Sequence, residues 1–423
     1  MICNLVDSIC RTRNYLYHVV SDFLHPFAKP TRTDFRTLVR GQGSVVYDNL
    51  GNQYIDAMAS LWYCAVGHGR SDMAQAIARQ AGTLAAYSTF DPFTNEPAEE
   101  LAEKLVAIGP IPKSRTFFTS SGSESVDTAM KLARLAHVQA GQPERTLIIS
   151  RQRGYHGTTY GGTSAQGIPP NREGYGPLVG DVEQVGADDI EAMATLMAQR
   201  GNTVAAVLVE PLQGAGGVFP PQDGYLQSVR RLCDQHGAFL IFDEVISGFG
   251  RLGTWFAADH YKVVPDLVTF AKAVTSGYQP LGGVFVGPTV RAPLEADANF
   301  FLRTGFTYSG HPTACAAALK NIEILEREDL LARAVHIGRR LSRGLQSLAD
   351  DGLIASIRGD GAVWAVSHHP HRDPMVIRDK MLDLGVITRA IGADANTFCP
   401  PLVTSDAQID QIVDTLATVL SAL

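Results

Sequence analysis

The sequence predicts an α/β protein in which a large domain with a mostly parallel central sheet is joined to a smaller α+β domain. From about residue 70, helical stretches alternate with short apolar runs: RTFFT, TLIIS, VAAVLV, FLIF, LVTF and GGVFV. Such alternation is typical of a parallel sheet covered by helices on both faces. After about residue 311 the pattern changes to a long helical stretch, residues 312–349, and then to mixed sequence. Because 423 residues exceed one typical hydrophobic core, we expect two domains.

The overall composition argues against several classes of protein. Hydrophobic residues make up 45% of the chain and charged residues 19%, as in an ordinary globular protein. The net charge of −7 and the lack of a basic run argue against nucleic-acid binding. No stretch approaches the ~18 apolar residues of a membrane span, and charged residues interrupt the N-terminal apolar pattern. The six cysteines lack metal-binding spacing. We therefore expect a cytoplasmic protein without a nucleic-acid, membrane or metal partner.

The N-terminal segment, residues 1–65, contains two predicted elements. Apolar residues at helical spacing predict an amphipathic helix over residues 5–24. Residues 43–58 are typical of a β-hairpin because asparagine and glycine supply turn chemistry in their middle. We expect this segment to pack with the small domain. The change in pattern then predicts a large domain over residues 66–310 and a C-terminal small domain over residues 311–423.

The stretch from Phe239 to Lys272 carries the strongest chemical signal. Its two apolar runs, FLIF and LVTFA, predict buried parallel strands that deliver Asp243 and Lys272 at their carboxyl ends, where ligands bind in such sheets. A lysine and an acid facing one cavity are what pyridoxal phosphate chemistry requires. Val245 should point to the same side as Asp243 and could pack against a cofactor ring. A structural ion pair between Asp243 and Lys272 is the alternative interpretation.

Ser121, Gly122 and Ser123 follow the strand RTFFT and open a predicted helix. Their hydroxyl groups, the small glycine and the helix N-terminus could together bind a phosphate. The spacing of Ser121 and Glu124 also fits a capping box, which explains the same residues without any ligand.

Two further motifs follow buried strands. Tyr155, flanked by glycines in GYHG, could stack on a planar ring, but it could equally cap the core. We give His156 beside it a supporting role, with a buried core histidine as the alternative. Glu210 ends the strand VAAVLV, where it could line a site or hold a loop through backbone N–H groups.

Three more features lie towards the C-terminus. Thr307, in the loop GFTYSGHP, could donate to a phosphate or belong to an ordinary helix-entry turn. Arg389 follows the strand-like run GVIT, and arginine binds carboxylates through its bidentate fork. The histidines of His368-His369-Pro370-His371 have no acidic ligand pattern near them, so we interpret them as a surface loop and not as a metal site.

Taken in order, the motifs SGSE, GYHGTT, VEPLQGAGG, FDEVISGFGRLG, PDLVTFAK and GFTYSGHP resemble the class III (omega) family of pyridoxal-phosphate-dependent aminotransferases. The resemblance covers roughly residues 25 to 420, and its most specific portion is the Asp-Glu-Val to lysine stretch. It implies a fold type I architecture, pyridoxal 5′-phosphate as cofactor, and a homodimer whose two active sites lie at the subunit interface.

The resemblance also implies roles for individual residues. Lys272 becomes the Schiff-base lysine, Asp243 the partner of the pyridinium nitrogen, and Glu210 a residue near the substrate. Tyr155 would stack on the cofactor ring, with Val245 beneath it. The residues implied at the cofactor phosphate are Ser121, Gly122, Ser123 and, from the neighbouring subunit, Thr307.

Details of the sequence indicate a branch of this family. Ile246 stands where ornithine and GABA aminotransferases typically carry glutamine, and the DEVISGFGR form resembles the pyruvate-using omega-amine branch. In that branch the residue matching Trp62 lines the substrate pocket, and the residue matching Arg389 binds the carboxylate of a keto or amino acid. Two departures are Ala273 in place of the usual glycine and an N-terminal lead of about 25 residues.

The reaction implied is the transfer of an amino group from an amine or omega-amino acid to a keto acid, expected to be pyruvate. It would proceed by ping-pong kinetics, with Lys272 carrying a proton between substrate and cofactor. Two rival interpretations stay open at this point. One is a same-fold aminomutase or amine lyase, which would need no keto acid. The other is a catalytically silent binding protein.

Overall fold

The computed structural model describes residues 22–423. The helix predicted over residues 5–24 therefore lies almost entirely outside the described residues, and the part that is described, Asp22 to Leu24, is not helical. The predicted hairpin is confirmed: β2 (Val45–Asp48) pairs antiparallel with β3 (Gln53–Asp56). A further strand, β1 (Leu38–Gln42), pairs with β2 on its other side.

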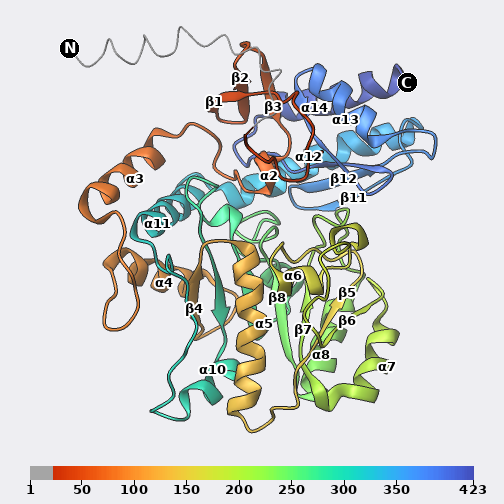
Figure 1. The fold of residues 1–423 in the computed structure, drawn as a ribbon. Helices are drawn as coiled ribbons and strands as arrows, with labels where there is room; N and C mark the ends of the chain where they lie inside the picture. The colour runs from red at the N-terminus through yellow and green to blue at the C-terminus, as the bar shows by residue number, and fades with distance from the viewer. Residues whose placement is uncertain (1–21) are drawn as a thin grey trace.

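A seven-stranded sheet forms the centre of the molecule, and all six predicted apolar runs are strands in it. Strands β5 to β9 run parallel to one another, while β10 pairs antiparallel with both β9 and β4. The predicted α/β architecture with a mostly parallel sheet is thus confirmed (Figure 1). In sheet order the strands are β4 (Arg115–Thr119), β10 (Gly282–Val286), β9 (Leu267–Phe270), β8 (Phe239–Asp243), β7 (Val204–Val209), β5 (Leu147–Arg151) and β6 (Val182–Val185).

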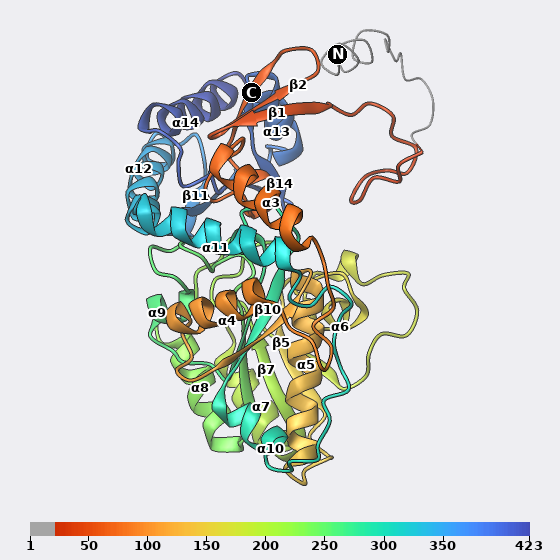
Figure 2. The same cartoon turned by 90° about the vertical axis from the view of Figure 1, so that its left-hand side faces the viewer.

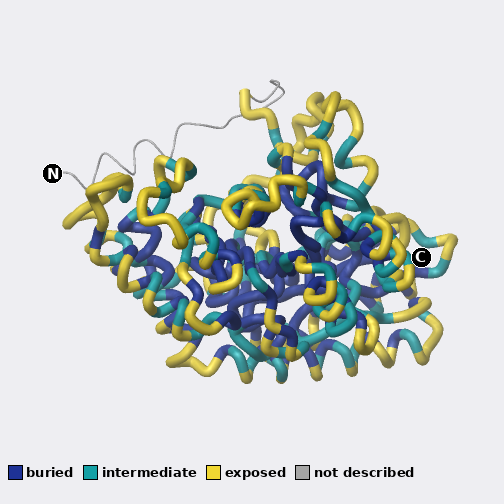
Figure 3. The backbone as a smooth tube through the Cα atoms, turned by 90° about the horizontal axis from the view of Figure 1, so that it is seen from below, coloured by how far each residue is buried: buried dark blue, intermediate teal, exposed yellow. Residues whose placement is uncertain are grey.

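Helices cover both faces of this sheet, which explains why its strands are apolar throughout (Figure 2). Successive strand residues face opposite sides: Ile148 packs with one buried cluster and Ile149 with the other. Helix α5 (Gly122–Gln139) contributes its apolar stripe to the first cluster, and α8 (Tyr225–His236) contributes to the second. The tube in Figure 3 shows these central strands as the buried interior of the molecule.

The other helices that flank or follow the sheet have clear ends. The predicted helical pattern over residues 312–349 is two helices, because Asp329 adopts a left-handed backbone (φ 49°) between them. The helices not yet given are α2 (Ala59–Trp62), α3 (Ser71–Leu84), α4 (Glu96–Ile108), α6 (Tyr160–Ala165), α7 (Ile190–Arg200), α9 (Ala257–Tyr261), α10 (Pro288–Glu295), α11 (Pro312–Arg327), α12 (Leu330–Asp350), α13 (Pro374–Asp383) and α14 (Asp406–Ser421). Across residues 22–423, none of the helices has the length and apolar character needed to span a membrane.

Two smaller sheets lie beyond the carboxyl ends of the central strands (Figure 1). One joins β1, β2 and β3 to β13 (Val386–Ile387), so the N-terminal segment pairs with the C-terminal part of the chain. The other has the order β11 (Ser356–Asp360), β12 (Val363–Ser367), β15 (Ala395–Phe398) and β14 (Arg389–Ile391).

The β11–β12 hairpin rests on the loops that follow β7 and β8. Arg358 Nε donates to the Gly217 carbonyl at 2.7 Å, and Ala362 N donates to the Arg251 carbonyl at 2.9 Å. These contacts bring the small sheet, with Arg389 on its strand β14, towards the ends of the central strands. The candidate site is formed there.

Candidate active site

Asp243 and Lys272 come from neighbouring strands. Asp243 is the last residue of β8 and pairs in register with Thr269 of β9, whose hydroxyl donates to Asp243 Oδ1 at 3.1 Å. Strand β9 ends at Phe270, and Lys272 follows in a short 3₁₀ turn, Lys272–Val274. The lysine has a φ of 50°, a left-handed conformation that residues with a side chain rarely adopt. Strained backbone of this kind clusters at functional sites.

The carboxylate of Asp243 is held by three donors. His156 Nδ1 lies 2.9 Å from Oδ2, while the Val245 backbone N–H and the Thr269 hydroxyl reach Oδ1 at 3.2 and 3.1 Å. Both Asp243 and His156 are buried. Asp243 is therefore a fixed hydrogen-bond acceptor at the end of β8.

The ion pair that was the alternative interpretation does not form. Among the ion pairs of residues 22–423, Asp243 pairs with His156, and Lys272 has no carboxylate at ion-pair distance. Burial lowers the pKa of the Lys272 amine, while the nearby charges of Asp243 and Glu210 oppose that shift. A lysine with a lowered pKa supplies more of the neutral amine that can act as nucleophile or base.

Glu210 follows β7 and clamps two loops. Its Oε1 accepts from the Tyr155 backbone N–H at 2.8 Å, and its Oε2 accepts from the Gly214 N–H at 2.9 Å. Burial raises the pKa of this carboxyl, and the two N–H donors oppose the shift. Of the two predicted roles, the structure contains the one in which Glu210 holds loops through backbone groups.

Ser121 caps helix α5, as the simpler interpretation of its motif predicts. Its side chain accepts from the Glu124 N–H at 3.2 Å. The Glu124 carboxylate bonds back to the N–H of Ser120, one residue before the position that a capping box requires.

The same helix N-terminus also meets two loops at very close range. A Cβ added at Gly122 would lie 2.8 Å from Val245 Cγ1, and one added at Gly157 would lie 2.5 Å from Ser123 Oγ. Ser123 Oγ also accepts from the Thr158 N–H at 3.0 Å. Small residues and N–H groups therefore surround the start of α5, an arrangement that suits a phosphate.

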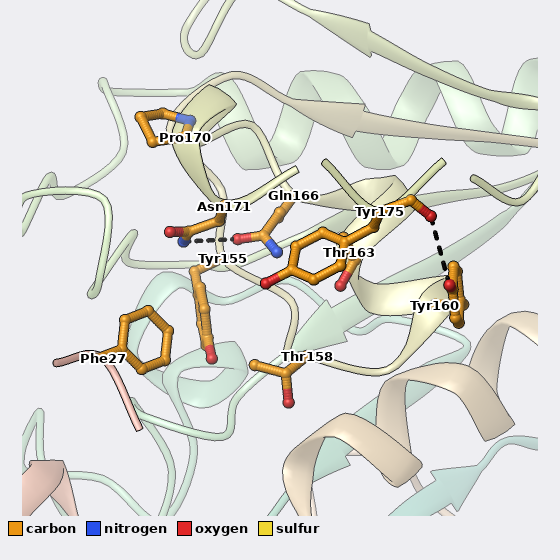
Figure 4. A pocket seen from close by; sticks show the side chains of 9 residues that line it. All are labelled: Phe27, Tyr155, Thr158, Tyr160, Thr163, Gln166, Pro170, Asn171 and Tyr175. Atoms are coloured by element: carbon orange, nitrogen blue, oxygen red, sulfur yellow. Dashed lines mark hydrogen bonds between the residues drawn. The ribbon is translucent and has the colours of Figure 1, made fainter. Parts of the chain in front are cut away.

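Tyr155 lies between the charged residues and a cavity. Burial raises the pKa of its phenol, and the nearby Arg389 guanidinium opposes that shift. The tyrosine also lines a cavity of about 370 Å³, in which Phe27 of the N-terminal segment lies beside it (Figure 4).

Arg389 is the first residue of β14, and Trp62 is the last residue of α2, which follows β3. Burial lowers the pKa of Arg389, and no ion pair of the described chain includes this residue. Its guanidinium is thus available to an external carboxylate. Trp62 is 2% exposed, has a left-handed backbone (φ 70°), and packs with Ile246 and Ile391.

Thr307 is exposed and lies on a loop before α11. The loop is anchored next to it, where the Ser309 hydroxyl donates to the Phe118 carbonyl at 2.8 Å and the Thr89 hydroxyl donates to the Ser309 carbonyl at 2.9 Å. The exposed position agrees with a residue that would act in a neighbouring subunit.

The histidine cluster is only partly a surface loop. His368 is buried at the end of β12, and its Nε2 lies 2.7 Å from Asn396 Oδ1, while His371 is exposed. No group of three or more potential metal ligands occurs within residues 22–423.

Comparisons with known proteins give the family. Residues 27–420 match the family described as aminotransferase class-III. The chain is a class III aminotransferase. A beta-alanine–pyruvate aminotransferase of Pseudomonas aeruginosa is 36% identical over 92% of this chain and 93% of its own. A putrescine–pyruvate aminotransferase of that organism is 36% identical over 89% of each chain. The crystal structure of a transaminase from the marine bacterium Virgibacillus superposes with a TM-score of 0.92, at 35% identity over 95% of this chain and 97% of that one.

Class III aminotransferases depend on pyridoxal phosphate and transfer an amino group between small-molecule amines and keto acids. The residues of this chain fit that cofactor. The phosphate could lie at the start of α5, in a space that a Cβ added at Gly122 or Gly157 would fill. Asp243 offers a fixed acceptor for a protonated ring nitrogen, and Lys272 offers an amine without a carboxylate partner. The implied fold type I architecture and cofactor are thereby confirmed.

Two residues of the site were missed by the sequence analysis. Thr269 was interpreted only as part of an apolar strand. It lies one residue before the end of β9, opposite Asp243 of β8, and its hydroxyl donates to the Asp243 carboxylate. Phe27 was missed because it lies in an irregular segment, where no periodic pattern shows which surface a side chain meets.

Proposed function

We propose that this class III aminotransferase takes the amino group of an amine or omega-amino acid and passes it to pyruvate, with ping-pong kinetics. The single observation that carries the proposal is the unpaired amine of Lys272 beside the anchored carboxylate of Asp243. Pyruvate as acceptor is supported by the relatives named for it and by the unpaired guanidinium of Arg389, which suits a keto-acid carboxylate.

The residues of the chain divide the work between holding and proton transfer. When bound, pyridoxal phosphate supplies an electron sink for the carbon that loses its proton. Asp243, fixed in place by His156 and Thr269, would hold the ring nitrogen protonated. Lys272 Nζ takes the proton from the substrate carbon as a general base and returns it as a general acid. Its lowered pKa increases the fraction of neutral amine available for the first of these steps.

The remaining predicted residues have binding roles in this proposal. Tyr155 and Val245 would contact the cofactor ring, and Glu210 fixes Tyr155 through its backbone. Trp62 and Arg389 would contact the substrate. Ser121, Gly122 and Ser123, with Thr307 of the neighbouring subunit, would bind the phosphate.

The assembly and its setting are also proposed. The exposed loop that carries Thr307 supports a homodimer with shared active sites, because an exposed side chain is accessible to a neighbouring subunit. The parallel pairing of β13 with β3 supports a division into an N-terminal segment (residues 1–65), a large domain (66–310) and a small domain (311–423). We place the enzyme in the cytoplasm.

Single-turnover assays test this function. The enzyme loaded with pyridoxal phosphate is mixed with L-alanine, and then, after removal of products, with a keto acid. We expect pyruvate to form in the first step only in amounts equal to the enzyme, and alanine to re-form when pyruvate is added. Lys272→Ala should abolish both steps. Continued product formation without any keto acid would instead indicate a lyase or mutase and would overturn the proposal.

A further inference from the structure

The cavity beside Tyr155 has a composition that the reaction does not explain. Of the described residues, none that lines its 370 Å³ carries a charge. The lining consists of aromatic rings, hydroxyl groups, two amides and a proline, which we call the tyrosine cavity: Phe27, Tyr155, Thr158, Tyr160, Thr163, Gln166, Pro170, Asn171 and Tyr175 (Figure 4). Since a cavity of about 150 Å³ can hold benzene, this one has room for the far end of a sizeable substrate.

Tyr155 is shared by the tyrosine cavity and the reacting centre. The charged groups that act on its phenol are Arg389, Asp243 and Glu210, and none of these lines the cavity. A donor whose amine lies at Lys272 would therefore pass from a charged environment into a neutral one as its chain extends past Tyr155.

The floor of the cavity is built on the backbone that carries Tyr155. Gln166 is 1% exposed, its Nε2 donates to the Gly157 carbonyl at 3.3 Å, and its Oε1 accepts from Asn171 Nδ2 at 3.0 Å. The Gly167 N–H donates to the Gly154 carbonyl at 2.7 Å. The amide groups are thus held in place before any ligand arrives, which lowers the entropy cost of binding.

Polar groups remain free in the lining. Within the part of the chain that the structure describes, Thr163 Oγ1 and Asn171 Oδ1 accept and donate no hydrogen bond. A neutral ligand group with its own donor or acceptor can satisfy them. A charged end would meet no opposite charge in the lining, so whatever hydration it gave up there would not be compensated.

We propose that the tyrosine cavity receives the far end of the amine donor and selects donors whose far end is uncharged and hydrogen-bonding, such as an amide or a hydroxyl. Diamines and other donors with a second charge are then poor substrates. This inference rests on the proposed function, because it assumes that an amine reacts at Lys272.

Putrescine and N-acetylputrescine form a matched pair for the test, since they share the reacting amine and differ in the charge of the far end. With the loaded enzyme and pyruvate, we expect kcat/KM to favour N-acetylputrescine on the order of tenfold or more. Asn171→Asp, which adds a carboxylate to the cavity, should shift that ratio towards putrescine by about tenfold. Asn202→Asp adds the same charge on an exposed turn away from the cavity and should leave the ratio unchanged.

A second variant and a binding measurement guard against a misfolded first variant. Thr163→Val removes a hydroxyl without adding charge, and should raise KM for N-acetylputrescine while leaving that for pentylamine unchanged. N-Propylacetamide carries the neutral far end but no reacting amine. Saturation-transfer NMR should show it bound to the wild-type protein and weakened in Thr163→Val, independently of turnover.

The outcomes separate the two proposals. Equal use of both donors, a preference for putrescine, or an unchanged ratio in a folded Asn171→Asp variant would overturn the role of the tyrosine cavity while leaving amino transfer intact. If neither these donors nor L-alanine passes its amino group to any keto acid, the proposed function itself fails, and the inference fails with it.

Discussion

His156 Nδ1 lies 2.9 Å from Asp243 Oδ2, and both side chains are buried. The Nε2 of the same ring has no hydrogen-bond partner among the described residues. Nδ1 is therefore the ring atom through which His156 holds the carboxylate. The sequence analysis gave His156 only a supporting role, and this contact defines that role as positioning the acid.

Replacing His156 should weaken the hold on Asp243. We expect His156→Leu to lower kcat/KM by roughly tenfold to a hundredfold, because a hydrogen bond to a buried charge contributes about 1.5–3 kcal/mol. His156→Asn keeps a donor near the Nδ1 position and should retain more activity. The pH dependence of the cofactor absorbance should shift in the leucine variant and much less in the asparagine variant. Identical spectra and rates in all three proteins would contradict the positioning role.

The close approach of Gly157 to Ser123 predicts a specific loss of cofactor binding. In Gly157→Ala the new Cβ would displace Ser123, whose Oγ lies 2.5 Å from its position. We expect the Kd for pyridoxal phosphate to rise by tenfold or more. Gly141→Ala is the control, because Gly141 also has a positive φ (77°) but no neighbour within 4 Å. Backbone strain is common to the two variants, so equal effects on Kd would contradict a role for this contact in the phosphate cradle.

Arg389 should act on the keto acid and not on simple amines. We expect Arg389→Met to raise KM for pyruvate by about a hundredfold, since a bidentate, charge-assisted contact is lost. The half-reaction with a donor that lacks a carboxylate should change by only a few-fold. Arg378→Met is the matched control, because Arg378 is already paired with Asp379. A similar loss with both kinds of substrate would show that Arg389 serves the fold and not the carboxylate.

Glu244, next to Asp243 in the chain, is buried, and we therefore expect the stability of the protein to depend on pH. Burial raises its pKa to about 7, from an ordinary value of 4.5, although the Ala257 and Ala258 N–H groups oppose the shift. Between these values the folded state binds more protons than the unfolded state. The contribution of Glu244 to the free energy of unfolding is therefore greatest below about pH 4.5 and falls, by on the order of 2–3 kcal/mol, as the pH rises to about 7.

Urea titrations across this range check the pH dependence. The free energy of unfolding of Glu244→Gln should fall less steeply from pH 4.5 to 7 than that of the wild type, because the variant has no proton to lose. Glu144→Gln, at an exposed glutamate, should keep the wild-type slope. Parallel curves for Glu244→Gln and wild type would contradict the raised pKa.

The sequence predicted the central sheet and its family well because these rest on local signals. Six apolar runs of strand length marked six of the central strands, and the order of motifs carried the family. One local motif can also have two structural roles. In the phosphate motif, Ser121 caps α5, while Ser123 contacts the loop after β5.

What the sequence could not predict depends on long-range contacts. Nothing local indicates that Glu210 would hold the backbone of Tyr155, or that Lys272 would lie in a left-handed turn outside its strand. The break at Asp329 is equally hidden, because both helices share one amphipathic pattern. The tyrosine cavity brings Phe27 beside Tyr155, across more than a quarter of the chain, and only the folded structure relates the two.

The most direct test of the account is to locate the covalent bond between the enzyme and its cofactor. The enzyme loaded with pyridoxal phosphate is reduced with borohydride and digested, and the peptides are analysed by mass spectrometry. We predict the pyridoxyl group on Nζ of Lys272 in the wild type and on no lysine in Lys272→Ala. Its attachment to another lysine, or its absence from the wild-type protein, would contradict the central claim.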